Sequence, residues 1–158
     1  MTNIKMSYNP TSINPIEEFT EVKPSKIHGL GLYAKKFMPK GTVWWHAREK
    51  DVLIVTKDQF LTLDSSAKSS SMENYITLLL TYSYYERDFD ALVFCLDNCR
   101  YVNHSPNPNS GAPEDESPFR SVALRDIQVG EELTEDYLKY TICNWLKKYN
   151  GLFDPTCW

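Results

Sequence analysis

The stretch RYVNHSPNPN, residues 100–109, decides how this chain is interpreted. It follows an apolar segment, Ala91 to Leu96, that is typical of a buried strand, and it places Asn-His-Ser before two Asn-containing proline turns. Two further strings lie at a distance on either side, SKIHGLGLYA (25–34) and RDIQVGEELTEDY (125–137). Asn, Ser and Pro at a strand end are also ordinary turn chemistry. The three strings therefore have to be interpreted together.

The glycine string His28-Gly29-Leu30-Gly31 superficially matches a dinucleotide-binding loop. Such a loop needs a strand before it and a helix after it. Here Leu32 to Phe37 is strand-like and runs into Pro39, so this interpretation fails. Two alternatives remain: an ordinary β-turn, or a bare backbone segment that approaches a ligand closely.

The other two strings leave similar alternatives open. His104 has no Cys, Asp or second His at ligand spacing, which makes a zinc site unfavourable. The string that ends in Tyr137 is compatible with an amphipathic hairpin closed by a core tyrosine. Four cysteines (Cys95, Cys99, Cys143 and Cys157) show no paired metal-ligand spacing, and we expect them to be reduced and the protein to need no metal.

Composition places the chain among ordinary globular proteins. Its 158 residues suit one compact domain with a real core, and 42% hydrophobic and 24% charged residues are typical of that class. A net charge of −4 argues against a general nucleic-acid binder. The polar N-terminus lacks the apolar core of a secretory signal and no stretch has the length of a membrane span, so we expect an intracellular protein, cytoplasmic or nuclear.

Residue patterns predict a β-dominated α+β domain with few helices. Two capping boxes are expected to start helical segments. Thr56 and Gln59 open a short helical turn, and Ser70 and Glu73 start a longer helix. A C-terminal helix is expected over 141–149, with Trp145 on its apolar side. The expected strands are Glu18 to Val22, Leu32 to Ala34, Thr42 to Trp45, Val52 to Val55, Ala91 to Leu96 and Phe119 to Leu124.

These patterns divide the chain into three parts. Residues 1–15, rich in Asn, Ser and Pro, are expected to form a flexible arm. Residues 16–140 form the domain itself, and residues 141–158 form a C-terminal helix and tail that pack on it. An acidic loop is expected over 111–118.

Together and in this order, the three strings resemble the SET-domain protein-lysine N-methyltransferases, over about residues 21–140. The resemblance implies a fold of several short sheets in which the segment before Tyr137 threads beneath the Asn-His segment as a pseudoknot. It also implies S-adenosylmethionine as cofactor. Gly29, Leu30 and Gly31 would bind its methionine part through main-chain groups, Asn103 its ammonium, and His104, mostly by backbone, its adenine.

By the same resemblance, Tyr137 is the catalytic residue and also contacts the cofactor. A substrate lysine that enters a water-poor aromatic channel is pushed toward its neutral form, because desolvation disfavours the ammonium. In-line positioning of amine and methyl group then lowers the barrier. The sequence leaves open which aromatic residues line the channel: Tyr82, Tyr84, Tyr85, Phe94, Tyr101 or Tyr140.

Two features depart from common family patterns. Many members bind a structural zinc through a cysteine in the Asn-His motif and others after the catalytic tyrosine, whereas this chain has Pro106 in the motif and only Cys143 and Cys157 afterwards. We expect the C-terminal helix with Trp145 to close the channel instead. Glu135 stands where relatives often carry Phe or Tyr, which leaves the number of methyl groups added open.

Three functions remain in competition. The first is methyl transfer to a lysine of a protein substrate, such as a histone, a ribosomal protein or another basic protein. The second is a non-catalytic SET-like module that binds S-adenosylmethionine or a protein partner. The third is a small β-rich interaction domain, which failure to bind the cofactor in calorimetry would favour.

Overall fold

A computed structural model describes residues 13–113, 119–140 and 143–152, apart from the side chains of 147 and 150–152. Its architecture is α+β and rich in short strands, as predicted. The parts of the expected arm, acidic loop and tail at 1–12, 114–118, 141–142 and 153–158 lie outside the described residues. Among the described helices, none is both long and apolar enough to cross a bilayer.

The first sheet carries the residues of the three strings. Its order is β1-β2-β10-β7, and β10 lies between β2, to which it is antiparallel, and β7, to which it is parallel. A strand near the C-terminal end of the domain thus lies beside the Asn-His segment. The four strands are β1 (Thr20–Pro24), β2 (Leu30–Ala34), β7 (Asn103–His104) and β10 (Glu132–Glu135).

Two more antiparallel sheets complete the framework. One has the order β3-β9-β8 and the other β4-β6-β5. The indoles of Trp44 and Trp45 are buried in the main core, which is built between the sheets. The strands are β3 (Val43–His46), β4 (Val52–Thr56), β5 (Ser83–Glu86), β6 (Ala91–Cys95), β8 (Ser110–Gly111) and β9 (Arg120–Ala123).

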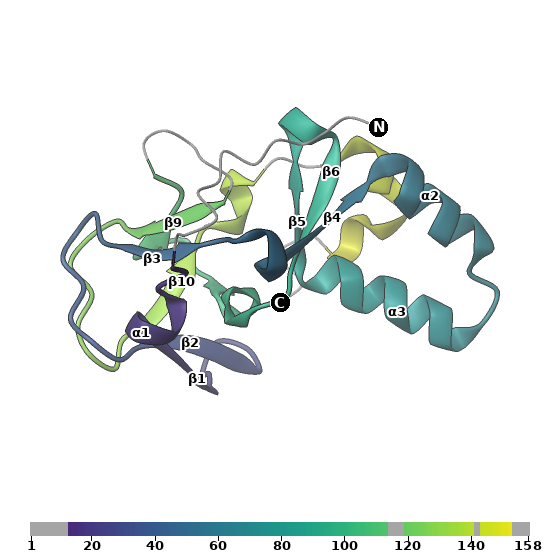
Figure 1. Cartoon of the computed structure of the whole chain (residues 1–158). Helices are drawn as coiled ribbons and strands as arrows, with labels where there is room; N and C mark the ends of the chain where they lie inside the picture. The colour runs from purple at the N-terminus through teal and green to yellow at the C-terminus, as the bar shows by residue number, and fades with distance from the viewer. Residues whose placement is uncertain (1–12, 114–118, 141–142, 153–158) are drawn as a thin grey trace.

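A pair of helices, α2 (Lys57–Ser66) and α3 (Ser70–Thr81), extends to one side of β4 and β6, opposite the end that holds α1, β1 and β2 (Figure 1). The predicted capping box of Thr56 and Gln59 is present, but it opens a ten-residue helix rather than a short turn. The cap of α3 is Ser69, whose side chain accepts from the Met72 amide, and not Ser70 as predicted. In a run of serines, sequence alone does not select the capping residue.

The helical pair has a core of its own. Phe60 of α2 and Ile76, Leu79 and Leu80 of α3 pack against Leu92 of β6. Cys143 and Leu146 of the C-terminal segment complete this second cluster. The helices thereby pack on one face of β6, whereas Val93 and Cys95 on its other face belong to the main core.

The remaining elements are short. The predicted strand at 18–22 begins two residues later, because Glu18 and Phe19 belong to α1 (Ile16–Phe19), whose first turn is acidic, as helix starts favour. The C-terminal segment is a 3₁₀ helix with a non-helical residue at Leu146, rather than one regular helix. The 3₁₀ segments are η1 (Glu49–Asp51), η2 (Arg87–Phe89), η3 (Asn98–Tyr101), η4 (Tyr137–Lys139) and η5 (Asn144–Leu152).

Candidate functional site

Asn103 joins the Asn-His string to the glycine string. Its Nδ2 atom donates to the carbonyl oxygens of His28, at 3.2 Å, and Leu30, at 3.0 Å. The same nitrogen lies 2.8 Å from Oε1 of Glu132, which belongs to the third string. One side chain therefore brings together three segments that are far apart in the sequence.

Glu132 is held firmly beside the glycines. Its Oε1 atom also accepts from Ser25 Oγ, at 2.7 Å, and its Oε2 atom from the Tyr33 hydroxyl, at 2.9 Å. A Cβ atom added to Gly31 would lie 2.2 Å from Glu132 Oε1, far inside contact distance. Gly31 is therefore required for the close approach of this carboxylate to the β2 backbone.

The result is a corner rich in hydrogen-bond acceptors. It contains the Glu132 carboxylate and the carbonyls of His28 and Leu30, and no described residue donates to Oδ1 of Asn103. Gly29, with a φ of +47°, turns the chain at this corner, and no atom outside its neighbours lies within 4 Å of where its Cβ would be. Such a set of acceptors suits a ligand with an ammonium group.

His104 and Tyr137 meet at the end of the parallel pair β7 and β10. The Tyr137 amide donates to Nδ1 of His104 at 3.1 Å, and the two ring centroids are 5.4 Å apart. Because Nδ1 accepts this bond, Nε2 carries the proton in a neutral ring. The Tyr137 hydroxyl points inward and donates to the Val102 carbonyl.

Two more tyrosines surround Tyr137. The rings of Tyr84 and Tyr140 stack with centroids 5.8 Å apart, and the centroids of Tyr137 and Tyr140 are 6.0 Å apart. Burial, followed by the negative charge of Glu135, raises the pKa of the Tyr137 and Tyr140 hydroxyls above the usual range. Both hydroxyls are therefore neutral near pH 7 and serve as hydrogen-bonding groups.

The family model of the SET domain matches residues 29–138, which is more than half of the chain. The chain belongs to the SET-domain family. No curated protein sequence shows significant similarity to it.

Solved structures with a similar fold support the same assignment at the level of the fold. The Polycomb Repressive Complex 2 of Chaetomium thermophilum has a TM-score of 0.56 at 17% identity, over 82% of this chain and 17% of that chain. ctPRC2 in an autoinhibited conformation bound to S-adenosylmethionine has a TM-score of 0.57 at 16% identity, over 84% of this chain and 17% of that chain. This SET domain thus spans a small part of those chains.

The six aromatic candidates for a lysine channel separate into three groups in the SET domain. Tyr84 and Tyr140 lie beside Tyr137, whereas Tyr85 and Phe94 pack against the second hydrophobic cluster. Tyr82 and Tyr101 pack edge to face, and the Arg100 guanidinium lies over both rings. Local sequence could not separate these groups. Neighbouring residues on a strand point to opposite faces of the sheet, and the distant segments that pack on each face determine which face lies near Tyr137.

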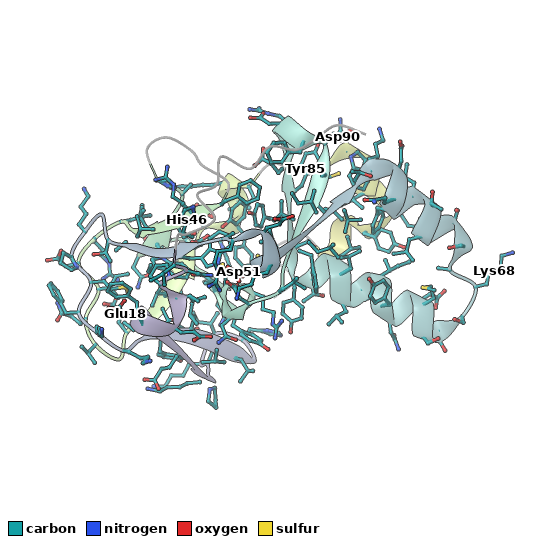
Figure 2. The ribbon with its side chains drawn as sticks, in the orientation of Figure 1. Glu18, His46, Asp51, Lys68, Tyr85 and Asp90 are labelled. Carbon is teal, nitrogen blue, oxygen red and sulfur yellow. The ribbon has the colours of Figure 1, made fainter. Side chains whose placement is uncertain are left out.

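Trp145, which we expected to close the channel, has its described contacts elsewhere. Its indole packs against Phe60 and Tyr85, and Nε1 donates to Asp90 at 2.8 Å. Tyr85 and Asp90 lie next to each other at the end of β5 and β6 (Figure 2), joined by a 2.8 Å hydrogen bond. The described part of the C-terminal segment therefore supports the second cluster rather than the tyrosine group.

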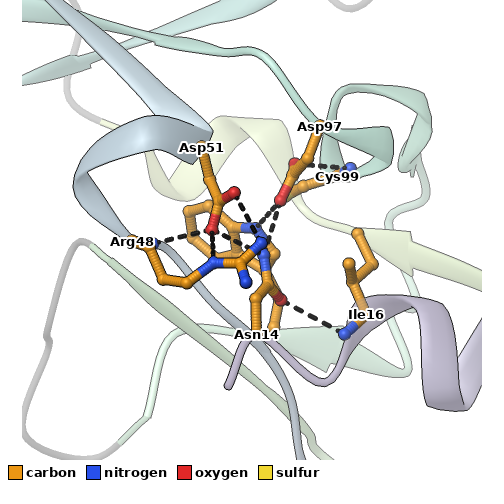
Figure 3. Close-up of polar contacts among 7 residues, drawn as sticks. Asn14, Ile16, Arg48, Asp51, Asp97 and Cys99 are labelled. Carbon is orange, nitrogen blue, oxygen red and sulfur yellow. Dashed lines mark hydrogen bonds and ion pairs between the residues drawn. The ribbon is translucent and has the colours of Figure 1, made fainter. Parts of the chain in front are cut away.

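A buried polar cluster joins the chain before α1 to Asp51 of η1 and to Asp97 at the start of η3 (Figure 3). Nδ2 of Asn14 donates to Asp51 at 3.1 Å and to Asp97 at 2.7 Å, and Asp51 also pairs with Arg48. Burial raises the pKa of Asp97. Asn14, at the end of the expected arm, is thus buried and bonded to the domain.

Cysteines and metal ligands contribute no further site among the described residues. Cys95, Cys99 and Cys143 are free thiols, and a hydrogen bond from the Cys99 thiol to Cys95, together with burial, raises the pKa of Cys99. The described part of the chain has no group of three or more His, Cys, Asp or Glu side chains placed to hold a metal ion. Cys157 lies outside the described residues.

Proposed function

We propose that this SET domain transfers a methyl group from S-adenosylmethionine to the side-chain amine of a lysine in a protein substrate. The observation that supports the proposal most directly is the convergence of Asn103, His104 and Tyr137 with the glycine string. Family membership supports the same chemistry.

The acceptor-rich corner fits the methionine end of the cofactor. We propose that Asn103, through Oδ1, and the main chain of Gly29 to Gly31 hold the cofactor's ammonium and carboxylate ends, and that His104 contacts its adenine. When bound, S-adenosylmethionine supplies an electrophilic methyl group. Every other part of the chemistry is positioning by the protein.

Tyr137 is the proposed catalytic residue. A tyrosine hydroxyl is protonated near pH 7, and burial raises the pKa of Tyr137 further, so it acts as a hydrogen-bonding group that orients the substrate amine. The rings of Tyr84 and Tyr140 exclude water and make the neutral amine more accessible by desolvation. The carbonyl of Val102, which now accepts from Tyr137, is a further acceptor at this place.

The test is incubation of the protein with labelled S-adenosylmethionine and candidate substrates, followed by mass spectrometry of the modified residue. Histone H3 is the first candidate because a similar structure was solved with histone H3 species bound. Ribosomal proteins and other basic proteins form the second set. Label on a lysine supports the proposal, and binding without transfer to any candidate favours the non-catalytic SET-like module.

A further inference from the structure

Glu135 is a buried carboxylate that lies among the tyrosines. It is the last residue of β10, pairs in register with His104 of β7, and has only 6% of its surface exposed. Its Oε2 atom accepts from the Tyr140 hydroxyl, and the rings of Tyr84 and Tyr137 lie next to the Tyr140 ring, with centroids 5.8 and 6.0 Å from it. Its side chain is therefore at the inner end of the tyrosine group.

The orientation of this carboxylate is determined by a chain of hydrogen bonds. The Trp44 indole, which can only donate, lies 2.7 Å from Ser110 Oγ. Ser110 therefore accepts from Trp44 and gives its single proton to Oε1 of Glu135, at 3.0 Å. The Tyr140 hydroxyl donates to Oε2. Both oxygens act as acceptors, so the carboxylate is held ready for a further donor.

Among the described residues, no lysine, arginine or histidine forms an ion pair with Glu135. Carboxylates are rarely this buried without a cation, because desolvation of the charge costs several kcal/mol. Two neutral hydroxyl donors offset part of that cost. The remaining charge has no positive partner within the described part of the chain.

The surroundings of Glu135 suit an organic cation that enters from the surface. Tyr137 and Tyr140 have 36% and 37% of their surface exposed, while their hydroxyls point inward to Val102 and Glu135. The Tyr140 ring therefore reaches from the protein surface to the buried carboxylate, and the Tyr137 ring lies beside it. Aromatic faces attract ammonium groups, and the attraction grows when water is excluded.

We propose that Glu135 is the counter-charge that binds the ammonium group of the substrate lysine beside the partly exposed rings of Tyr137 and Tyr140. This role rests on the proposed function and makes it more specific: the site selects an alkylammonium side chain over a neutral one of the same shape, and the bound ammonium gives one proton to the Glu135 carboxylate before the neutral amine attacks the methyl group. Glu135 is a specificity-determining residue, whereas Ser110 and Trp44 are positioning residues that hold it.

The first experiment measures binding of a lysine side-chain analogue without any turnover. n-Butylammonium and n-butanol are titrated separately into the purified protein, with and without S-adenosylhomocysteine, and shifts of the tyrosine ring signals are followed by NMR. We expect saturable binding of n-butylammonium only. Equal binding of both compounds, or binding of neither, overturns the proposal.

Three variants then assign the charge. Glu135→Gln keeps the shape and should weaken n-butylammonium binding at least about tenfold, as expected when a hydrogen bond to a charged group is lost. Glu18→Gln, an exposed residue paired with Lys36, is the control for net charge and should leave binding unchanged. Tyr140→Phe keeps the carboxylate and removes one of its donors, so binding should be maintained or strengthened. A Glu135→Gln protein that melts normally and binds as well as wild type shows that Glu135 has a structural hydrogen-bonding role only.

A kinetic experiment separates this inference from the proposed function. The substrate is a peptide that the wild-type protein methylates. Glu135→Gln should raise KM for this peptide about tenfold and leave the Kd for S-adenosylmethionine unchanged. Methyl transfer with an unaltered KM in the variant overturns the role of Glu135 and leaves the proposed function intact. Charge-dependent n-butylammonium binding without methyl transfer to any lysine substrate has the opposite meaning: the cation site stands and the proposed function fails.

Discussion

On the glycine side of the site, formed by Gly29 to Gly31, Asn103 and Glu132, the contacts are hydrogen bonds to main-chain carbonyls and one carboxylate. On the tyrosine side, formed by Tyr84, Tyr137, Tyr140 and Glu135, they are ring contacts and inward-pointing hydroxyls. The first side suits a polar ligand held in place, and we propose that the second excludes water around the substrate amine. Substitutions on the two sides should therefore separate cofactor binding from turnover.

Tyr137→Phe should have the largest effect, and only on turnover. The ring remains and only the hydroxyl is lost, so the rate of methyl transfer should fall by about 10- to 1,000-fold, as when one positioned polar group is removed. Cofactor affinity should change far less. Single-turnover transfer and thermal unfolding are measured on the same protein. If Tyr137 is only a core tyrosine, stability falls modestly and turnover stays near normal.

Tyr82→Phe is the matched control on the tyrosine side. Its ring packs against Tyr101 and lies under Arg100, away from the three clustered tyrosines. Removal of its hydroxyl should leave turnover unchanged. Equal losses in both variants would mean that any tyrosine hydroxyl in the region contributes through stability alone.

Asn103→Ala should act on the glycine side and weaken cofactor binding. The substitution removes the Oδ1 acceptor that we propose for the cofactor's ammonium, at a cost of about 1–3 kcal/mol, or roughly 5- to 150-fold in Kd. Calorimetric titration with S-adenosylmethionine measures this Kd. Asn107→Ala, at an exposed position four residues on, is the control. A folded Asn103→Ala protein with unchanged Kd would exclude Asn103 from the binding site.

Gly31→Ala tests the close approach on the glycine side and should act on stability rather than on turnover. The new methyl group would displace the Glu132 carboxylate, which three donors hold, so we expect a loss of about 1–3 kcal/mol, typical of overpacking. Thermal unfolding should show a decrease of roughly 2–10 °C. At Gly111 an added Cβ meets only a Leu124 methyl at 3.3 Å, so Gly111→Ala should lower the melting temperature less. Equal shifts would contradict the steric explanation.

Local signals predicted the parts of this fold that local energetics determine. The cap at Thr56 and the apolar spacing in α3 favour helices without help from distant residues, and both helices are present. The two-residue strands β7 and β8 were not predicted, because their pairing depends on β10 and β9 rather than on their own residue types. The strand β5 was not predicted either, because it depends on its pairing with β6.

The same distinction applies to the site. Motif residues such as Asn103 and Tyr137 were identified by resemblance, and the structure brings them together around β7 and β10. Glu132, by contrast, was not predicted, because its partners Ser25 and Asn103 are 107 and 29 residues away in sequence. No local pattern distinguishes Glu132 from its neighbour Glu131, which instead pairs with Arg125 at the surface.

Metal removal should have the smallest effect of all, on either side of the site. The contacts that we propose for the cofactor are main-chain groups, Asn103 and His104, and those that we propose for the substrate are Tyr137 and Glu135; none of them requires a cation bridge. Excess EDTA should therefore leave the Kd for S-adenosylmethionine, single-turnover transfer and the melting temperature unchanged. Structural metal sites contribute folding free energy directly, so a chelator that lowered the melting temperature would reveal one. Loss of cofactor binding at an unchanged melting temperature would instead place a metal ion on the glycine side and contradict the role that we assign to its acceptors.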